Sequence, residues 1–372
     1  MRRCWVLPPV GVLLAATSGC GSSASEVCER GAPGTVCPIA GNGELAFNRD
    51  GLPAAQTAFY LPSEVRRGPD GRVYVMDFNN MRLRRVESDG NVATIAGSGV
   101  HALATEGSPA TASPLENPID FDFLPDGRVA FVSYHDPRVL VIDTDGTLRR
   151  LAGMLQPGVI GNEGDGGPAL DAQFLELTGI VVAPDGTIYV SDDMAHRVRV
   201  IRNGTVDTLA GNGLPGRGGD GGPARDATLA APSALARDAA GNLYVSDPGS
   251  HVVREVSPDG VISTVAGTGD RGFEGDGGPA IDAVLAGPDG VAVGSDGTLY
   301  IGDRLNSRVR KIAPDGTIST LGGTGVSGMT GNGGPARDAE FGLVSRVQLD
   351  SDGGLLVSDQ SNSCIRKIVS PL

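Results

Sequence analysis

The chain has 372 residues with 30 basic and 44 acidic side chains, which gives it a net charge of −14 at pH 7. This acidic balance argues against a nucleic-acid partner, because binding to phosphates requires clustered Lys and Arg. Beyond the N-terminal leader, no apolar run approaches the roughly 20 residues that a helix needs to cross a bilayer.

The N-terminus has the pattern of a secretory signal. Arg2 and Arg3 precede an apolar run from Trp5 to Ala16, which is too short to span a membrane stably. Small residues then lead to Cys20, and this arrangement resembles the lipobox of bacterial lipoproteins, in which the cysteine is lipidated. Thr17 stands where that motif usually has Leu, and an ordinary cleaved signal is the alternative.

This pattern predicts a signal over residues 1–19 and a lipidated tether over residues 20–34. The resemblance implies a bacterial protein that is exported across the inner membrane and anchored in the outer membrane. It would face the periplasm or the cell surface, and would touch the membrane only through its lipid.

The cysteines left after the signal are Cys20, Cys28, Cys37 and Cys364. If Cys20 is lipidated, three thiols remain in an oxidising compartment, which is an odd number. We favour a Cys28–Cys37 disulfide, which leaves Cys364 free. Pairing of Cys364 with Cys28 or with Cys37 stays open.

The remaining sequence contains six repeats. The phrase Gly-Asp-Gly-Gly-Pro-Ala stands at 164–169, 219–224 and 275–280, with Asn for Asp at 331–336 and degenerate copies at 49–54 and 105–110. Six residues after each Pro stands a large apolar residue, and these markers are Phe59, Leu115, Phe174, Leu229, Leu285 and Phe341. The markers are 55 to 59 residues apart, which is the period of a repeat architecture.

The fifth repeat predicts four short strands, over residues 291–293, 298–301, 308–312 and 317–321. Gly297 and Gly316 fall in the turns, where glycine accepts a positive φ. Four-stranded sheets repeated six times without long helices predict an all-β fold, a six-bladed β-propeller of antiparallel blades over residues 35–372.

The sixth repeat contains only three strands before the chain ends. The missing outer strand is found at the front, because residues 35–41 align with residues 317–323 of the fifth repeat. We therefore expect the N-terminal strand to complete the last blade and to close the ring.

Two sequence patterns resemble NHL-repeat proteins. A strand of the form Leu-Tyr-Val-Ser-Asp stands at 243–247, and His-Arg-Val-Arg stands at 196–199. The resemblance extends over nearly all of residues 35–372, and the Gly-Asp-Gly-Gly-Pro-Ala linker is typical of bacterial members and of teneurin-like propellers. It implies the propeller fold and a protein that binds, since only some propellers of this kind catalyse a reaction.

An Asp and an Arg recur together in five repeats and are both missing from the second, which has Ser133 and Leu140. We interpret them as charge-assisted structural pairs that join the second strand of a blade to the third. The alternative is a ring of acids that binds cations. The pairs are Asp77 with Arg84, Asp192 with Arg199, Asp247 with Arg254, Asp303 with Arg310 and Asp359 with Arg366.

The linker phrase has a structural explanation of its own. Its glycines supply unusual backbone angles, its Pro starts a short helix, and its Asp can accept bonds from neighbouring amides. That helix would direct the marker residue between blades. Ca²⁺ is a weaker alternative, because each loop offers only one or two carboxylates. We therefore expect no cofactor.

Three histidines could lie on one rim. His196 and His251 occupy the same position in adjacent repeats, His135 lies nearby in the second, and His101 lies in a linker. Such a group could bind Zn²⁺, as in propeller-shaped amidating lyases. Because His is ordinary at this position of an NHL repeat, we expect no metal.

A ligand would sit at the mouth of the central channel. Just inside the mouth we expect Glu64, Asp120, Asp289 and Arg346. The second repeat is the most divergent, and its Tyr134 and His135 add candidates for ligand binding, since binding residues concentrate on loops.

No catalytic motif is evident, neither Gly-x-Ser-x-Gly nor His-Glu-x-x-His nor a nucleotide loop. We expect a monomeric, non-catalytic module that binds a protein, peptide or glycan through its linker-bearing face. The alternative is a cation-dependent lactonase or lyase that uses the channel mouth.

Overall fold

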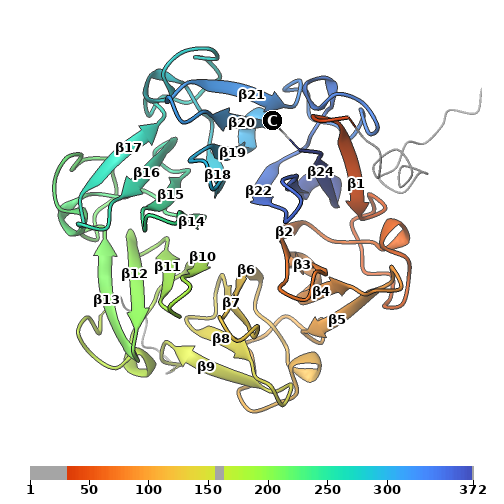
Figure 1. The fold of residues 1–372 in the computed structure, drawn as a ribbon. Coiled ribbons are helices and arrows are strands. Elements are labelled where there is room, and N and C mark those ends of the chain that lie inside the picture. Colours follow the sequence, from red (N-terminus) through yellow and green to blue (C-terminus); the bar gives the residue numbers. More distant parts are fainter. Residues whose placement is uncertain (1–31, 156–162, 371–372) are drawn as a thin grey trace, which may run out of the picture.

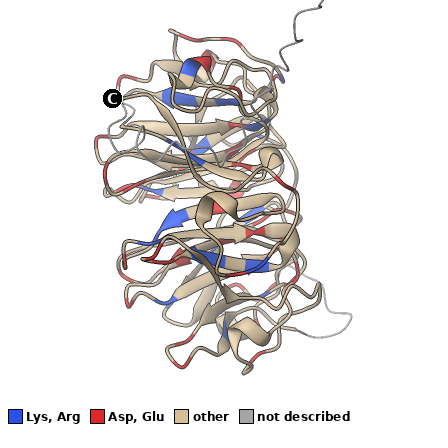
Figure 2. Cartoon of the chain, turned by 90° about the vertical axis from the view of Figure 1, so that its right-hand side faces the viewer, with Lys and Arg blue, Asp and Glu red and all other residues tan. Residues whose placement is uncertain are grey.

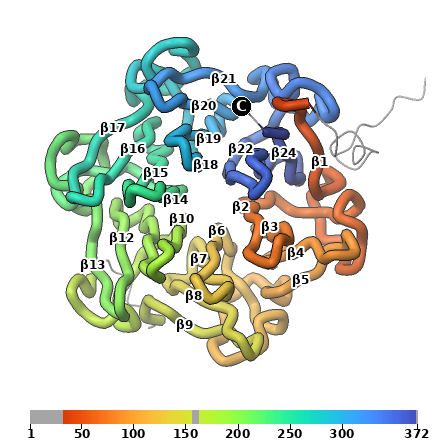
Figure 3. The backbone as a smooth tube through the Cα atoms, in the orientation of Figure 1, coloured from red at the N-terminus to blue at the C-terminus, as the bar shows by residue number. Residues whose placement is uncertain are grey.

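Six four-stranded antiparallel sheets form a ring around a central axis in the computed structural model, which describes residues 32–155 and 163–370 (Figure 1). In each blade the first strand lies nearest the axis and the last strand lies at the rim, so the chain winds outward blade by blade (Figure 3). The predicted six-bladed propeller is confirmed.

The strands of the first three blades have these bounds. Blade one holds β2 (Pro62–Arg67), β3 (Val73–Asp77), β4 (Arg82–Val86) and β5 (Val92–Ala96). Blade two holds β6 (Pro118–Phe123), β7 (Val129–Ser133), β8 (Val139–Ile142) and β9 (Leu148–Ala152). Blade three holds β10 (Leu177–Val182), β11 (Ile188–Asp192), β12 (Arg197–Arg202) and β13 (Thr205–Ala210).

The other three blades follow the same plan. Blade four holds β14 (Leu235–Arg237), β15 (Leu243–Asp247), β16 (Val252–Val256) and β17 (Ile262–Ala266). Blade five holds β18 (Pro288–Val293), β19 (Leu299–Asp303), β20 (Arg308–Ile312) and β21 (Ile318–Gly322). Blade six holds β22 (Val344–Leu349), β23 (Leu355–Asp359), β24 (Cys364–Ile368) and β1 (Val36–Ala40).

The N-terminal strand closes the ring, as predicted. β1 pairs antiparallel with β24, with Val36 opposite Ile368 (Figure 1). The Val36 amide also donates to the Gly334 carbonyl at 3.0 Å, and the Gly41 amide donates to the Ala54 carbonyl at 2.9 Å. The strand is therefore bonded to the last blade and to the linkers on both sides of it.

Each linker contains one turn of 3₁₀ helix, which is the lower end of the one or two helical turns that the sequence suggests. These helices are η1 (Ala54–Gln56), η3 (Ala110–Ala112), η4 (Ala169–Asp171), η5 (Ala224–Asp226), η6 (Ala280–Asp282) and η8 (Ala336–Asp338). Each begins after the Pro of the phrase. Gly219 precedes η5 with φ +99°, and a Cβ there would lie 2.7 Å from the backbone of Ala227. Only glycine fits this turn.

The core lies between neighbouring blades. All six marker residues are at most 1% exposed. Phe174, for example, packs with Val132 of blade two and with Ile180 and Val190 of blade three. The markers therefore fill the space between sheets, and burial of apolar surface joins each blade to the next.

Three further 3₁₀ turns connect second and third strands, namely η2 (Phe78–Asn80), η7 (Arg304–Asn306) and η9 (Gln360–Asn362). Each begins immediately after the recurring Asp. In blade one Asn80 donates to both carboxylate oxygens of Asp77, at 3.0 and 2.9 Å, and to the Ala46 carbonyl at 2.7 Å. The turn is thereby tied to the linker.

The recurring Arg is completely buried in each of the five blades that have it. It makes a direct ion pair with the recurring Asp in three of them, Asp77–Arg84 at 3.2 Å, Asp303–Arg310 at 3.1 Å and Asp359–Arg366 at 3.2 Å. In blades three and four Asp192 and Asp247 lie within the electrostatic reach of Arg199 and Arg254.

The linker Asp reaches the same Arg, a role that differs from the expected bonding to neighbouring amides. Arg84, Arg199, Arg254 and Arg310 lie 3.0, 2.6, 2.7 and 2.7 Å from Asp50, Asp165, Asp220 and Asp276. In blade six Asn332 accepts from Arg366 at 3.0 Å. In blades one and five, two acids from separate segments thus share one buried cation, and in every blade that has the Arg this contact fixes the linker to the blade.

Aromatic markers add to this arrangement. The guanidinium of Arg366 stacks over Phe341 at 4.4 Å, that of Arg199 over Phe174 at 5.5 Å and that of Arg84 over Phe59 at 5.7 Å. Each cation is therefore sandwiched between carboxylates and a π-face, and this environment suits arginine better than lysine.

Blade two lacks the recurring Asp and Arg and contains a different ion pair. Ser133 and Leu140 are buried at the positions of the recurring Asp and Arg. Asp136 and Arg138, both buried, form an ion pair at 2.6 Å, and Arg138 donates to the Ala104 carbonyl at 2.7 Å. The blade thus remains tied to its linker by a pair of its own.

Cys37 and Cys364 are both disulfide-bonded, and both are buried. The expectation that Cys364 is a free thiol is therefore wrong. Cys28, the partner that we favoured for Cys37, lies outside the described residues, as do the predicted signal, Cys20 and most of the tether.

Charge is distributed unevenly over the ring. Many acidic segments lie in loops at its edges, whereas several basic segments lie on strands (Figure 2). None of the helices in residues 32–155 and 163–370 has the length and apolar character needed to span a lipid bilayer.

Candidate functional site

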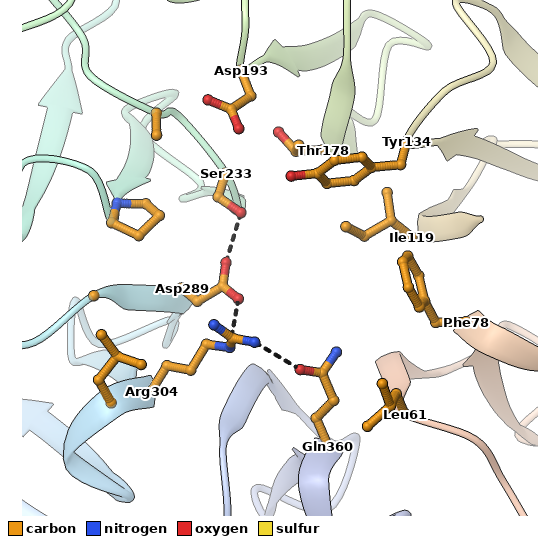
Figure 4. Close-up of a pocket in the computed structure, with 14 residues that line it drawn as sticks. Leu61, Phe78, Ile119, Tyr134, Thr178, Asp193, Ser233, Asp289, Arg304 and Gln360 are labelled. Carbon is orange, nitrogen blue, oxygen red and sulfur yellow. Dashed lines mark hydrogen bonds and ion pairs between the residues drawn. The ribbon is translucent and has the colours of Figure 1, made fainter. Parts of the chain in front are cut away.

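A pocket of about 410 Å³ opens at the centre of the linker-bearing face, a volume within the range of ligand sites. One position of the repeat, the residue directly after the second strand, contributes to it from every blade. These six residues, which we call the mouth ring, are Phe78, Tyr134, Asp193, Pro248, Arg304 and Gln360 (Figure 4). The scaffold around the ring repeats, but its six side chains all differ.

The pocket has two chemically distinct walls. The wall from blades one and two is apolar and aromatic, with Leu61, Phe78, Ile119 and Tyr134 (Figure 4). The remaining lining carries the polar side chains of the pocket, Thr178, Asp193, Ser233, Asp289, Arg304 and Gln360 (Figure 4), interspersed with Ala231, Pro248, Gly287 and Leu305. A ligand here would meet an aromatic surface on one side and hydrogen-bonding groups on the other.

Asp289 is held in place from several directions. Its Oδ1 accepts from the Ser233 hydroxyl at 2.7 Å and from Arg346 at 2.6 Å. Its Oδ2 lies 3.6 Å from Arg304, which also donates to Gln360 at 3.1 Å (Figure 4). These contacts orient the carboxylate before any ligand arrives, which reduces the entropic cost of binding.

Asp193 faces the same pocket in a very different electrostatic environment. Burial, together with the negative charges of Glu176 and Asp247, raises its pKa to about 7. Burial and a hydrogen bond to Glu176 likewise raise the pKa of Tyr134. Asp193 can therefore gain or lose a proton near neutral pH.

We expect the substitution Asp193→Asn to stabilise the protein at pH 8 and to leave its stability unchanged at pH 3. In the folded protein Asp193 keeps its proton up to about pH 7, whereas the ordinary pKa of Asp is 3.8. The free energy of unfolding of the wild type therefore falls as the pH rises between these two values. Asn cannot ionise and avoids this loss. With allowance for partial exposure, the gain is about 1–2 kcal/mol. Urea unfolding at both pH values measures it, and an equal effect at both would contradict the assignment.

Below the pocket, the channel is filled by a buried ionic network. Arg66 lies 3.3 Å from Asp120 and 3.7 Å from both Glu64 and Asp122. Arg346 lies 3.7 Å from Glu64 and donates to the Thr178 carbonyl at 2.9 Å. The network therefore joins first strands of opposite blades across the axis.

Glu64 is the buried acid of this network that has a carboxylate oxygen without a hydrogen bond within the described part of the chain. It is fully buried, its Oε1 accepts from the Val65 amide at 2.9 Å, and its Oε2 accepts no hydrogen bond from the described residues. Burial raises the pKa of Glu64 well above its usual value, and the two guanidinium groups oppose this only in part. Glu64 is therefore enclosed between Arg66 and Arg346 beneath the pocket.

The six residues that the sequence nominated for ligand binding fall into three groups. Asp289 and Tyr134 line the pocket. Glu64, Asp120 and Arg346 lie beneath it, where at most 2% of each residue is exposed. His135 lies in the loop between β7 and β8 with 59% of its side chain exposed, and its ring packs edge-on against Tyr134.

Sequence reasoning missed most of the mouth ring, including Asp193, Arg304 and Phe78. A usable signal was present, because all six members directly follow the end of a second strand. Positions that recur, such as the Asp one residue earlier, are more conspicuous in the sequence but belong to the scaffold. In a repeat protein, a position that varies within a constant frame is the better sign of a binding surface.

The sequence matches two models of known protein families. The teneurin NHL domain family matches residues 33–214, and the NHL repeat family matches residues 285–312. Teneurin-m of Drosophila melanogaster is 26% identical over 349 residues, which cover 86% of this chain. The chain spans only 12% of that protein's length.

Solved structures give the same fold. An auxiliary nutrient binding protein from Bacteroides thetaiotaomicron has a TM-score of 0.66 at 15% identity, over 89% of this chain and 75% of that one. A gluconolactonase from Xanthomonas campestris has a TM-score of 0.54 at 16% identity, over 83% and 86% of the two chains. At such identities the likeness concerns the fold alone. The protein is thus a six-bladed propeller that is similar, over residues 33–214, to the NHL domain of teneurins and contains a match to an NHL repeat at residues 285–312.

Proposed function

We propose that this chain is a non-catalytic binding propeller that recognises its ligand through the pocket on its linker-bearing face. The observation that carries the proposal is the mouth ring, in which six different side chains from six repeated frames face one pocket. The frames fix the positions of the side chains, and the side chains supply the specificity. The fold shared with an auxiliary nutrient binding protein supports this assignment.

Among protein, peptide and glycan ligands, the two walls favour a glycan. A sugar ring has an apolar C–H face and a rim of hydroxyl groups. Phe78 and Tyr134 provide an aromatic surface for the former, and Asp289 provides an oriented acceptor for the latter. Arg304 and Gln360 add donors beside it, as the specificity of a polar ligand requires.

A glycan array probed with the purified propeller tests this function. We expect saturable binding of a glycan, weakened about tenfold or more by Tyr134→Ala, because the aromatic wall loses its largest side chain. Met194→Ala is the matched control, since Met194 adjoins Asp193 in the chain but is 58% exposed and lies outside the pocket. Equal binding by the Tyr134 variant, or binding of peptides only, would contradict a glycan site.

One observation favours the enzymatic alternative, a lactonase or lyase at the channel mouth. Asp193 has a pKa of about 7 and faces the pocket, so it could transfer a proton near neutrality. Glu64, Asp120 and Asp289 already have guanidinium partners, which leaves Asp193 as the available acid of the pocket. Hydrolysis of sugar lactones in the presence of Ca²⁺, abolished by Asp193→Asn, would favour this alternative over simple binding.

We also propose that the chain is exported and held in the outer membrane through a lipid on Cys20, and that it acts as a monomer. The basic start, the short apolar run and the small residues before Cys20 support the anchor. The closed ring supports the monomer, because β1 completes the fourth strand of blade six within the same chain. In a bacterial expression host, Cys20→Ser should move the protein from the membrane fraction to the soluble fraction. Retention of the variant in membranes would contradict lipidation.

A further inference from the structure

Two histidines and a glutamate converge between the linker that precedes blade two and the loop between its second and third strands. His101 Nε2 lies 2.7 Å from Glu116 Oε1, and His135 Nδ1 lies 3.4 Å from the same oxygen. One ligand atom from each residue lies within 4.8 Å of the others. Asn117 Oδ1 also lies 2.8 Å from His101 Nε2, which brings a fourth oxygen to the cluster.

These residues come from three separate segments that the fold holds together. His101 makes a bridge with Leu115, next to Glu116, and the Tyr134 amide donates to the Asn117 carbonyl at 3.0 Å. Asp136 accepts from the Ala104 amide at 3.2 Å, and its partner Arg138 donates to the carbonyl of the same residue. The buried ion pair peculiar to blade two thus holds the His135 loop against the linker of His101.

The other two histidines show that this convergence is not general to the repeat. His196 Nδ1 is bonded to the Ala230 carbonyl at 2.8 Å, and His251 Nδ1 accepts from the Gly287 amide at 3.1 Å. Both rings therefore stabilise the backbone of a neighbouring blade. Within residues 32–155 and 163–370, His101, Glu116 and His135 are the one group of three His, Cys, Asp or Glu side chains whose ligand atoms converge.

We propose that His101, Glu116 and His135 form a binding site for a divalent transition-metal cation of the Zn²⁺ class. Two imidazole nitrogens and one carboxylate oxygen are ligands that Zn²⁺ accepts, whereas Ca²⁺ prefers oxygen alone. Asn117 or water would complete the coordination. The histidines are 55% and 59% exposed at their side chains, so a cation can reach them from solvent.

The site lies directly behind one wall of the pocket. His135 adjoins Tyr134, and their rings are 5.2 Å apart in an edge-on contact. A cation bound by His101 and His135 would tie the linker to the loop that carries Tyr134. This site goes beyond the proposed function, because it requires no ligand in the pocket.

Calorimetric titration of the EDTA-treated, tag-free propeller with ZnCl₂ tests the proposal. We expect one equivalent of Zn²⁺ to bind and the unfolding temperature to rise with its concentration. His101→Ala and His135→Ala should each weaken binding by about tenfold or more. The matched controls are His196→Ala and His251→Ala, which remove histidines engaged in backbone bonds and should leave Zn²⁺ affinity unchanged.

Titration with Co²⁺ gives a second readout that does not depend on stability. The visible absorption of bound Co²⁺ should appear with the wild-type protein and with both controls, and should be absent from the His101 and His135 variants. No heat of binding at about 100 µM Zn²⁺, far above the concentration range of a specific site, would overturn the proposal. Binding that the His101 and His135 variants retain would overturn it equally.

Discussion

Deletion of residues 35–41 is expected to abolish the cooperative unfolding of the propeller at moderate temperature. The deletion removes β1, the fourth strand of blade six, together with its ladder to β24. It also exposes Phe341 and Ile368, which pack with the fully buried Val36. We expect the deletion to lower the free energy of unfolding by at least about 5 kcal/mol, when an ordinary domain has about 5–15 kcal/mol in total. Circular dichroism during heating measures it.

Two controls separate closure from other effects. A chain that starts at residue 32 keeps β1 and should unfold like the longer protein. Because the deletion also removes the disulfide-bonded Cys37, the substitution Val36→Asp in an otherwise intact chain tests the strand alone. A buried carboxylate at this position should lower the unfolding temperature strongly. Unchanged unfolding of both the deletion and Val36→Asp would show that the ring does not depend on this strand.

Arg310→Leu is expected to cost roughly 3–5 kcal/mol, because it removes a fully buried cation and leaves Asp303 without its ion pair. Asp276 of the linker loses its contact with Arg310 as well, although that carboxylate is 40% exposed and can be hydrated. Most of the loss therefore comes from Asp303. Chemical denaturation of the variant gives the change in the free energy of unfolding.

The protein contains its own control for this experiment. Blade two has Ser133 and Leu140 at the positions of Asp303 and Arg310, and both are buried in an ordered blade. Arg310→Leu combined with Asp303→Ser should therefore recover most of the stability that Arg310→Leu alone loses, since no buried carboxylate is left unpaired. If the double variant is as unstable as the sum of the two single variants, the pair does not act as a unit.

The sequence by itself determined the architecture of this protein. The spacing of Phe59 through Phe341 fixes the number of blades, because each marker must be buried between two successive sheets. The alignment of residues 35–41 with a fourth strand fixes the closure, because an unpaired strand edge would remain without it. Both features arise from burial and hydrogen bonding that every repeat must satisfy, and such periodic constraints are visible as a pattern in one dimension.

The site was decided by the tertiary structure. The members of the mouth ring are far apart in the sequence, and only the closure of the ring brings Phe78 near Gln360. Glu64 and Asp120 carry the charges that suit a channel mouth, yet they form ion pairs with Arg66 and Arg346 below it. The cluster of His101, Glu116 and His135 arises in the same way. Side chains that recur at the same position of every repeat indicate the fold. Side chains that differ between repeats come together only in the tertiary structure, and these form the candidate sites of this protein.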